Sequence, residues 1–357
     1  MVMQDGGTVD VRPGPDPGRA APEHSGAYLA SGLCLALYAG ALIAWTVHGI
    51  AGGDGGLGDF VEGLFNPGAS PASQEVGPYE WAFAVAFLVI AALALAQRRI
   101  ARPAALLSAF LLLAVSLREG VGLLDAAYRD QYGNDELGGW ALATRGLGLL
   151  AALVILAMLF TATERRGGEA ADRQARDRRA TGSAPEGLDA RWRRLSRVCG
   201  VLFLLMGAAR LGWMVRDLAA PEVDMGRYLH GVLDASDPGS LRLAVTAEFT
   251  TVGSVLVLLV LGFLAVRGQR DVRGALLVFA AVELYLTVRT VVWLTVTDFF
   301  NQSFETTEGT LSLVTTAYSL AAMTSVVLLA TGRGFVPYGN PRPEPLRTAL
   351  DGRYGGR

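Results

Sequence analysis

The sequence is short of the residues on which metal and cofactor sites are usually built. Its 31 basic residues include no lysine, and it has only three histidines and two cysteines. Cys34 and Cys199 lie in separate apolar runs, which argues against a disulfide framework or a cysteine-based zinc site. Only His48 lies near an apolar run, so paired axial ligands for a membrane haem are missing. We therefore expect no cofactor and no metal.

Motifs of the common enzyme classes are also absent. The chain contains no HExxH sequence, no Gly-x-Ser-x-Gly elbow and no P-loop, which argues against zinc proteases, α/β-hydrolases and P-loop NTPases. Its net charge of −2 gives a nucleic acid no electrostatic attraction. Glu119 and Asp125 leave acid–base chemistry open, although two carboxylates at this spacing are a weak and common pattern.

What the sequence does contain is long hydrophobic runs. Hydrophobic residues make up 52% of the chain, charged residues make up 18%, and the mean hydropathy is +0.36. Runs of about 20 apolar residues match the thickness of a bilayer core, and runs of this length must be helical in lipid. We predict an all-α membrane protein with eight transmembrane helices, over roughly 28–50, 79–97, 103–124, 139–161, 198–218, 246–266, 274–296 and 310–331.

The polar segments between these runs alternate in charge. Segments 97–102, 164–197, 267–273 and the residues after 333 are rich in arginine, whereas the intervening loops are acidic or mixed. Because arginine-rich loops stay in the cytoplasm, both termini are predicted to be cytoplasmic, in a plasma membrane of bacterial type. Residues 1–25 are predicted to be a disordered cytoplasmic tail, 164–195 a charged cytoplasmic linker and 333–357 a C-terminal tail.

The two halves of the chain resemble each other. Adding 171 aligns Arg102 with Arg273 and Arg118 with Arg289. Adding 168 aligns Trp45 with Trp213, Gly63 with Gly231 and Glu80 with Glu248, and adding 172 aligns Glu136 with Glu308 and Thr144 with Thr316. The offset changes only at loops, which predicts two tandem four-helix repeats, 26–163 and 196–332. An even number of spans makes the repeats parallel.

Two short loop segments also correspond under this alignment. Residues 59–65 and 227–233 both carry apolar residues at helical spacing. We expect each to form a short extracytoplasmic interfacial helix, or alternatively a lid over a cavity. The tryptophans near the outer ends of the spans, Trp213 among them, are expected to form an aromatic belt.

The candidate site consists of ionisable residues inside or close to the spans. Such residues are costly in lipid and usually face protein or a wet cavity. They gather toward the extracytoplasmic side, which predicts an outward-facing polar pocket for a small anionic ligand or a lipid headgroup. The candidate ligand-binding residues are Arg118, Arg289, Arg210, Glu283, Arg145, Glu119, Glu80 and Glu248.

A purely structural role competes with this reading. Glu80 is predicted to pair with Arg118, and Glu248 with Arg289, to fix each four-helix unit. Arg210, Glu283 and Arg145 break the repeat and are therefore the better functional candidates.

Three functions remain open at this stage. The first is a non-enzymatic binding protein whose partners are membrane lipid or a small anion. The second is a secondary transporter, and the third is an enzyme acting on a lipid-linked substrate. The inner halves of spans three and seven are nearly all apolar, which argues mildly against transport. Oligomeric state is left open.

Topology can be tested with single cysteines. A cysteine at Ser183 is expected to resist a membrane-impermeant thiol reagent in intact cells, and one at Ser70 is expected to react, because arginine-rich segments stay inside. Labelling of Ser183→Cys from outside would overturn the orientation.

Overall fold

The computed structural model describes residues 18–52, 56–67, 76–161, 186–221, 224–235, 243, 245–268, 272–297 and 299–331. Its regular structure over these ranges is helical. The eight long helices are α1 (Ser25–Gly52), α3 (Pro78–Leu95), α4 (Ala101–Gly122), α6 (Gly138–Thr161), α8 (Glu186–Leu218), α10 (Ala247–Arg267), α11 (Arg273–Val296) and α13 (Thr307–Thr331).

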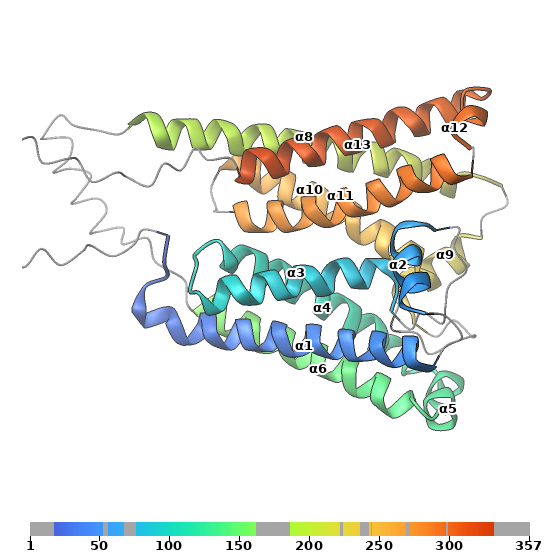
Figure 1. The fold of residues 1–357 in the computed structure, drawn as a ribbon, viewed down its shortest axis with the longest axis horizontal. Helices are drawn as coiled ribbons and strands as arrows, with labels where there is room; N and C mark the ends of the chain where they lie inside the picture. Colours follow the sequence, from blue (N-terminus) through green and yellow to red (C-terminus); the bar gives the residue numbers. More distant parts are fainter. Residues whose placement is uncertain are drawn as a thin grey trace, which may run out of the picture.

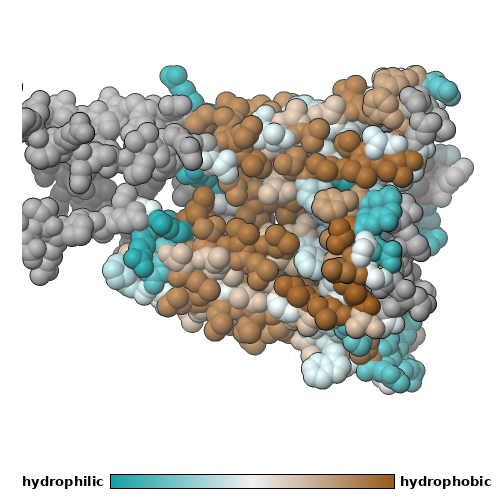
Figure 2. Space-filling model, in the orientation of Figure 1, coloured by the Kyte–Doolittle hydropathy of each residue, from teal (hydrophilic) through white to brown (hydrophobic). Residues whose placement is uncertain are grey.

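All eight predicted spans are confirmed as helices long and apolar enough to cross a membrane. Their sequences are rich in alanine and leucine, which favour helix, and a 22-residue helix such as α4 is about 33 Å long. A brown apolar band runs across the visible face of the helices, with teal polar residues near both ends (Figure 2). The chain is therefore a polytopic membrane protein.

The long helices lie side by side in two groups (Figure 1). In the first, α1 packs on α3 and α6, and α4 packs on α3 and α6. In the second, α8 packs on α10 and α13, and α11 packs on α13. The groups meet where α11 contacts α3 and α4. We call the end at which α1 begins and α13 ends the terminal end, and the other end the capped end.

Each group has its own apolar core. The first core includes Leu35, Phe87 and Ile155, and it also takes in Val278 and Val282 from α11 of the other group. Phe203, Phe279 and Met323 lie in the second core. Because α11 contributes to both, the two groups are joined by an apolar seam.

The seam is tightest at the terminal end. A Cβ atom added to Gly274 would lie 2.0 Å from the carbonyl oxygen of Ile100, which is backbone and not a movable side chain. Only glycine permits this close approach of α11 to the residue preceding α4. The contact closes the terminal end of the seam.

Four short helices lie at the capped end: α2 (Leu57–Phe65), α5 (Ala126–Asn134), α9 (Met225–Leu233) and α12 (Phe299–Gln302). The helical segments expected at 59–65 and 227–233 are α2 and α9. Helix α5 was not predicted from the sequence, although its start carries a recognisable signal. The Asp125 side chain accepts a hydrogen bond from the Ala127 backbone N–H at 2.8 Å and so caps the helix.

Two predicted boundaries are corrected by the structure. Residues 18–24, expected in a disordered tail, are packed against the turn between α3 and α4, where Ala20 N–H donates to the Gln97 carbonyl at 2.7 Å. Helix α8 begins at Glu186, inside the segment expected as a linker up to residue 195. The rest of that linker and the C-terminal tail lie outside the described residues.

The close approach at Gly274 gives a prediction for stability. Gly274→Ala is expected to lower the free energy of unfolding by about 1–3 kcal/mol, because an added methyl group overpacks the seam. Gly253→Ala in α10 is the matched control, since a Cβ there meets nothing within 4 Å. Thermal unfolding in detergent measures both, and equal melting temperatures would contradict the tight seam.

Candidate functional site

The eight candidate residues do not converge on one pocket. Arg118, Glu119, Arg145 and Glu80 belong to the first helix group, and Arg210, Glu283, Glu248 and Arg289 to the second. Nearly all of them engage groups on other segments of the chain. What each one engages decides whether it is available to a ligand.

Arg118 and Arg289 hold the short helices of the opposite groups. The Arg118 Nη2 on α4 donates to the Gly231 carbonyl of α9 at 3.0 Å. The Arg289 Nη2 on α11 reaches the Gly63 carbonyl of α2 at 3.5 Å. The α2 helix is held further by the Tyr285 hydroxyl, which donates to the Leu64 carbonyl at 2.7 Å.

The predicted pairs of these arginines with glutamates are therefore wrong. In the described part of the chain, the ion pairs within 4.0 Å include neither Glu80 with Arg118 nor Glu248 with Arg289. Each guanidinium group instead makes one bond to a backbone carbonyl on a segment that is distant in sequence, while its Nε atom is buried without a hydrogen-bond partner among the described residues. Equal depth in the membrane was not enough to identify the partner.

Glu80 and Arg145 instead secure the segment before α10. A Glu80 carboxylate oxygen accepts from the Val245 backbone N–H at 2.9 Å. The Arg145 Nη2 donates to the Leu243 carbonyl at 2.8 Å. Both side chains come from the first group and hold a segment of the second, so their contacts are structural.

Glu119 is the centre of a buried cluster. It accepts hydrogen bonds from the hydroxyls of Tyr128 at 2.7 Å and Tyr132 at 2.5 Å, and its other oxygen lies 3.4 Å from Arg145 Nε. Burial raises the pKa of Tyr128 to about 12 and also raises that of Tyr132. Both phenols therefore keep their protons at neutral pH and remain donors to the carboxylate, which leaves Glu119 poorly placed for acid–base chemistry.

Arg210 and Glu283 do meet, in the middle of the second group. The Arg210 Nη1 donates to Glu283 Oε1 at 3.0 Å, and its Nη2 donates to the other carboxylate oxygen. Arg210 also donates to the Ser254 hydroxyl, which itself donates to Glu283 at 2.9 Å. The Glu283 side chain is 1% exposed and the Arg210 side chain 26%, so the arginine faces open space and the glutamate supports it.

The open space beside Arg210 is a cavity of about 290 Å³ between α8, α11 and α13. We call it the hydroxyl cleft. Helix α8 supplies Arg210, Trp213 and Asp217 along one face. Six hydroxyl groups complete the polar lining: Thr287, Thr290, Ser312, Thr315, Thr316 and Ser319.

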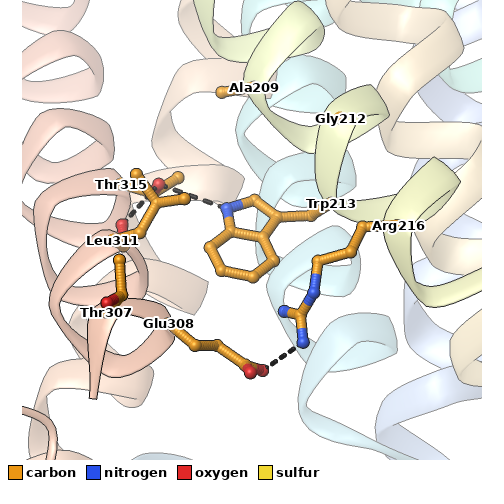
Figure 3. Close-up of a pocket in the computed structure, with 8 residues that line it drawn as sticks. All are labelled: Ala209, Gly212, Trp213, Arg216, Thr307, Glu308, Leu311 and Thr315. Carbon is orange, nitrogen blue, oxygen red and sulfur yellow. Dashed lines mark hydrogen bonds and ion pairs between the residues drawn. The ribbon is translucent and has the colours of Figure 1, made fainter. Parts of the chain in front are cut away.

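A second cavity adjoins the hydroxyl cleft between α8 and α13. This apolar groove, of about 470 Å³, has Ala209, Gly212 and Leu311 in its lining, and it shares Trp213 and Thr315 with the hydroxyl cleft. Figure 3 shows the Trp213 indole between the two helices, with its Nε1 donating to Thr315 at 3.2 Å. Farther along, Arg216 and Glu308 form an ion pair at 2.5 Å.

The hydroxyl groups of the cleft were not predicted as site residues from the sequence. Their spacing contained a signal, since Ser312, Thr315, Thr316 and Ser319 recur at intervals of three and four residues and so share a helix face. Trp213 was assigned to an aromatic belt, and its bond to Thr315 was not foreseen. Within the described residues no three His, Cys, Asp or Glu side chains are grouped as a metal ion would require.

The chain was compared with known families, proteins and structures. No protein-family model, no curated protein and no solved structure matches the chain. Function is therefore inferred from the geometry of the two cavities and of the charged groups around them.

The Arg210–Glu283 pair gives a prediction. Glu283→Gln is expected to lower the free energy of unfolding by up to about 3–5 kcal/mol, because a guanidinium group loses its buried counter-charge. Glu248→Gln is the matched control. Glu248 is also partly buried in a long helix, but the described contacts give it no ion pair.

A second variant shows whether lost charge pairing is the cause. The combined change Arg210→Met and Glu283→Leu is expected to recover most of the stability, since buried ion pairs are often replaceable by apolar residues. Thermal unfolding in detergent compares the stability of Glu283→Gln, Glu248→Gln and the combined variant with that of the wild type. Wild-type stability in Glu283→Gln alone would contradict a structural role for the pair.

Proposed function

We propose that this chain is a plasma-membrane protein of two tandem, parallel four-helix units, residues 26–163 and 196–332, that binds a lipid through the second unit. The lipid headgroup lies in the hydroxyl cleft, and an acyl chain lies in the apolar groove. The protein acts as a binding protein and not as an enzyme.

Matched contacts support the duplication. Arg102 donates to the Leu159 carbonyl at 3.1 Å, and Arg273 to the Ala330 carbonyl at 2.9 Å. Donors and acceptors both differ by 171 positions, since 273 − 102 and 330 − 159 are equal. Independent apolar helices would not be expected to repeat a contact with both partners in register.

The indole–threonine contact also recurs. Trp45 donates to the Thr144 hydroxyl at 2.9 Å, as Trp213 does to Thr315. This recurrence supports an offset of 171, which matches Thr144 with Thr315, in place of the offset of 172 that aligned Thr144 with Thr316.

The bonds of Arg118 and Arg289 support the same proposal. Arg118 holds Gly231 and Arg289 holds Gly63, and Gly63 and Gly231 are themselves repeat partners. Each unit therefore grips the short helix of the other through an equivalent bond. Such a reciprocal exchange is the contact pattern expected of two related units about a pseudo-twofold axis along the membrane normal.

The short helices α2 and α9 have the surface expected of interfacial helices. Large apolar side chains are exposed at every fourth position of each one: Leu57, Val61 and Phe65 on α2, and Met225, Leu229 and Leu233 on α9. A short helix with one exposed apolar face at the end of a bundle suits the boundary between headgroups and acyl chains. We propose that both helices lie there.

The distribution of charge supports the orientation. At the terminal end, Arg99 lies between α3 and α4 and Arg102 lies in the first turn of α4, while Arg267 ends α10 and Arg273 begins α11. Arginine-rich ends face the cytoplasm. The terminal end is thus proposed to be cytoplasmic, and the capped end with both cavities extracytoplasmic.

One observation carries the proposal of lipid binding. A polar cavity and an apolar cavity lie side by side between α8 and α13, separated by the side chains of Trp213 and Thr315 that line both. A ligand that fills both must have a polar and an apolar part. The dimensions, about 290 and 470 Å³, are in the range of small-molecule sites.

The geometry favours binding over transport. On the terminal side of Arg210 and Glu283 lies the apolar core with Phe203, Phe279 and Met323, and the seam at Gly274 is closed. A polar solute crossing here would meet buried apolar side chains along half of the membrane.

Filling the apolar groove tests the proposal. A Cβ at Gly212 meets nothing within 4 Å, and Gly212 lines the groove, so the side chain of Gly212→Leu is expected to occupy it. We expect lipid that remains bound after mild detergent extraction to fall about tenfold, which is about 1.4 kcal/mol of binding free energy. Native mass spectrometry counts the bound lipid.

The matched control is Ala44→Leu, at the position of α1 that the 168-residue offset aligns with Gly212. Ala44 is exposed and lies outside both cavities, so its enlargement is expected to leave bound lipid unchanged. Equal lipid occupancy in Gly212→Leu and wild type, or an equal loss in both variants, would refute the proposed site.

A further inference from the structure

Most hydroxyl groups of the cleft already donate their hydrogens to other groups of the protein. A carbonyl oxygen can only accept, so a hydroxyl that bonds to one must be the donor. Four threonines of the cleft donate to the carbonyl four residues earlier in their own helix. These are Thr287 at 2.7 Å, Thr290 at 3.0 Å, Thr315 at 2.8 Å and Thr316 at 2.9 Å.

A fifth hydroxyl is committed by the same reasoning. The oxygens of Thr287 and Ser319 lie 2.9 Å apart. Since the Thr287 hydrogen points to its own helix, Ser319 must donate to Thr287. Of the six hydroxyl groups that line the cleft, only Ser312 keeps a hydrogen that no described bond uses.

The N–H donors of the cleft are largely used as well. Arg210 commits three of its five N–H groups to Glu283 and Ser254, and the carboxylate of Glu283 neutralises its charge. The Trp213 N–H donates to Thr315. An anionic group entering the cleft would find few free donors, contrary to what the arginines of the sequence led us to expect.

Acceptors, in contrast, remain available. Each committed hydroxyl oxygen still has lone pair density to offer, and Asp217 adds an exposed carboxylate on the same face of α8. With Arg210 paired to Glu283, Asp217 leaves the lining with a negative balance. The cleft therefore suits a ligand that supplies hydrogen-bond donors and carries no net negative charge.

The first unit is packed differently at the corresponding place. The ring of Tyr38 lies so close to Gly148 that an added Cβ would lie 2.9 Å from it. The 168-residue offset places Met206 where the first unit has Tyr38, and Met206 lines the hydroxyl cleft.

We infer that the headgroup bound in the cleft is rich in hydrogen-bond donors and carries no net negative charge, as in a glycosyl diacylglycerol or an ethanolamine phospholipid. The inference rests on the proposed lipid site and specifies its chemistry. Sugar hydroxyls or an ammonium group would donate to the threonine oxygens and to Asp217. Both sources share this donor chemistry, and the experiment separates them.

The test measures the affinity of the purified full-length chain for four lipids with the same acyl chains: glycosyl diacylglycerol, phosphatidylethanolamine, phosphatidylcholine and phosphatidic acid. The protein is held in a detergent without sugar groups, and bound lipid is counted by native mass spectrometry. We expect one or both donor-rich lipids to bind about tenfold more tightly than phosphatidylcholine, which is also uncharged overall but has no donor, because each good hydrogen bond adds a modest gain.

A double variant assigns the preference to the cleft. Thr290→Val with Thr316→Val removes two acceptors with little change of shape, and it is expected to abolish the preference while leaving phosphatidylcholine binding unchanged. Thr161→Val is the matched control, because Thr161 makes the same bond to its own helix at 2.8 Å but is exposed at the end of α6.

The outcomes separate the two proposals. Tightest binding of phosphatidic acid, or a preference that survives in the double variant, would overturn the donor-rich headgroup while leaving the lipid site in place. If none of the four lipids binds in a way that depends on the Gly212→Leu change, the lipid site itself fails. A melting temperature equal to that of Thr161→Val would verify that the double variant is folded.

Discussion

A guanidinium group inside an apolar helix must find oxygen partners, and this requirement organises the protein. Charged groups in a bilayer are expensive unless they are paired or hydrated. Arg118, Arg145, Arg210 and Arg289 each reach an oxygen on another helix or segment. Because apolar helices in lipid gain little from simply meeting one another, such polar contacts fix which helices meet and in which register.

Most of these contacts join the two halves of the chain. Arg118, Arg145 and Glu80 of the first half bind backbone groups of the second, and Arg289 of the second half reaches back to the first. A half-chain alone would leave Arg118, Glu80 and Arg289 without these backbone partners, and Arg145 with Glu119 alone. These side chains, which were predicted from the sequence to bind an anion, therefore mainly hold the two halves of the chain together.

The two helix groups differ in how their last long helices are held. The fourth helix of the first group, α6, is held by Arg145 on Glu119 and by Thr144 on Trp45, and Gly148 lets it press against α1. The last long helix of the second group, α13, has the Trp213–Thr315 bond and the exposed Arg216–Glu308 pair, and two cavities lie beside it. These cavities are where we propose that the lipid binds.

The sequence by itself determined the eight helices. Length and hydropathy are local properties of a segment, and an apolar segment long enough to cross a bilayer core must be helical there. It also indicated the short helices α2 and α9, and it singled out Arg210 and Glu283 as charges that break the repeat, without predicting that they pair. Only the tertiary structure decided that Arg118 takes a carbonyl of Gly231 and not the carboxylate of Glu80. Every residue has a carbonyl, so a sequence cannot show which one lies within reach. The hydroxyl cleft was hidden for the same reason: threonines at helical spacing are visible, but the empty space that they face exists only once three helices have packed.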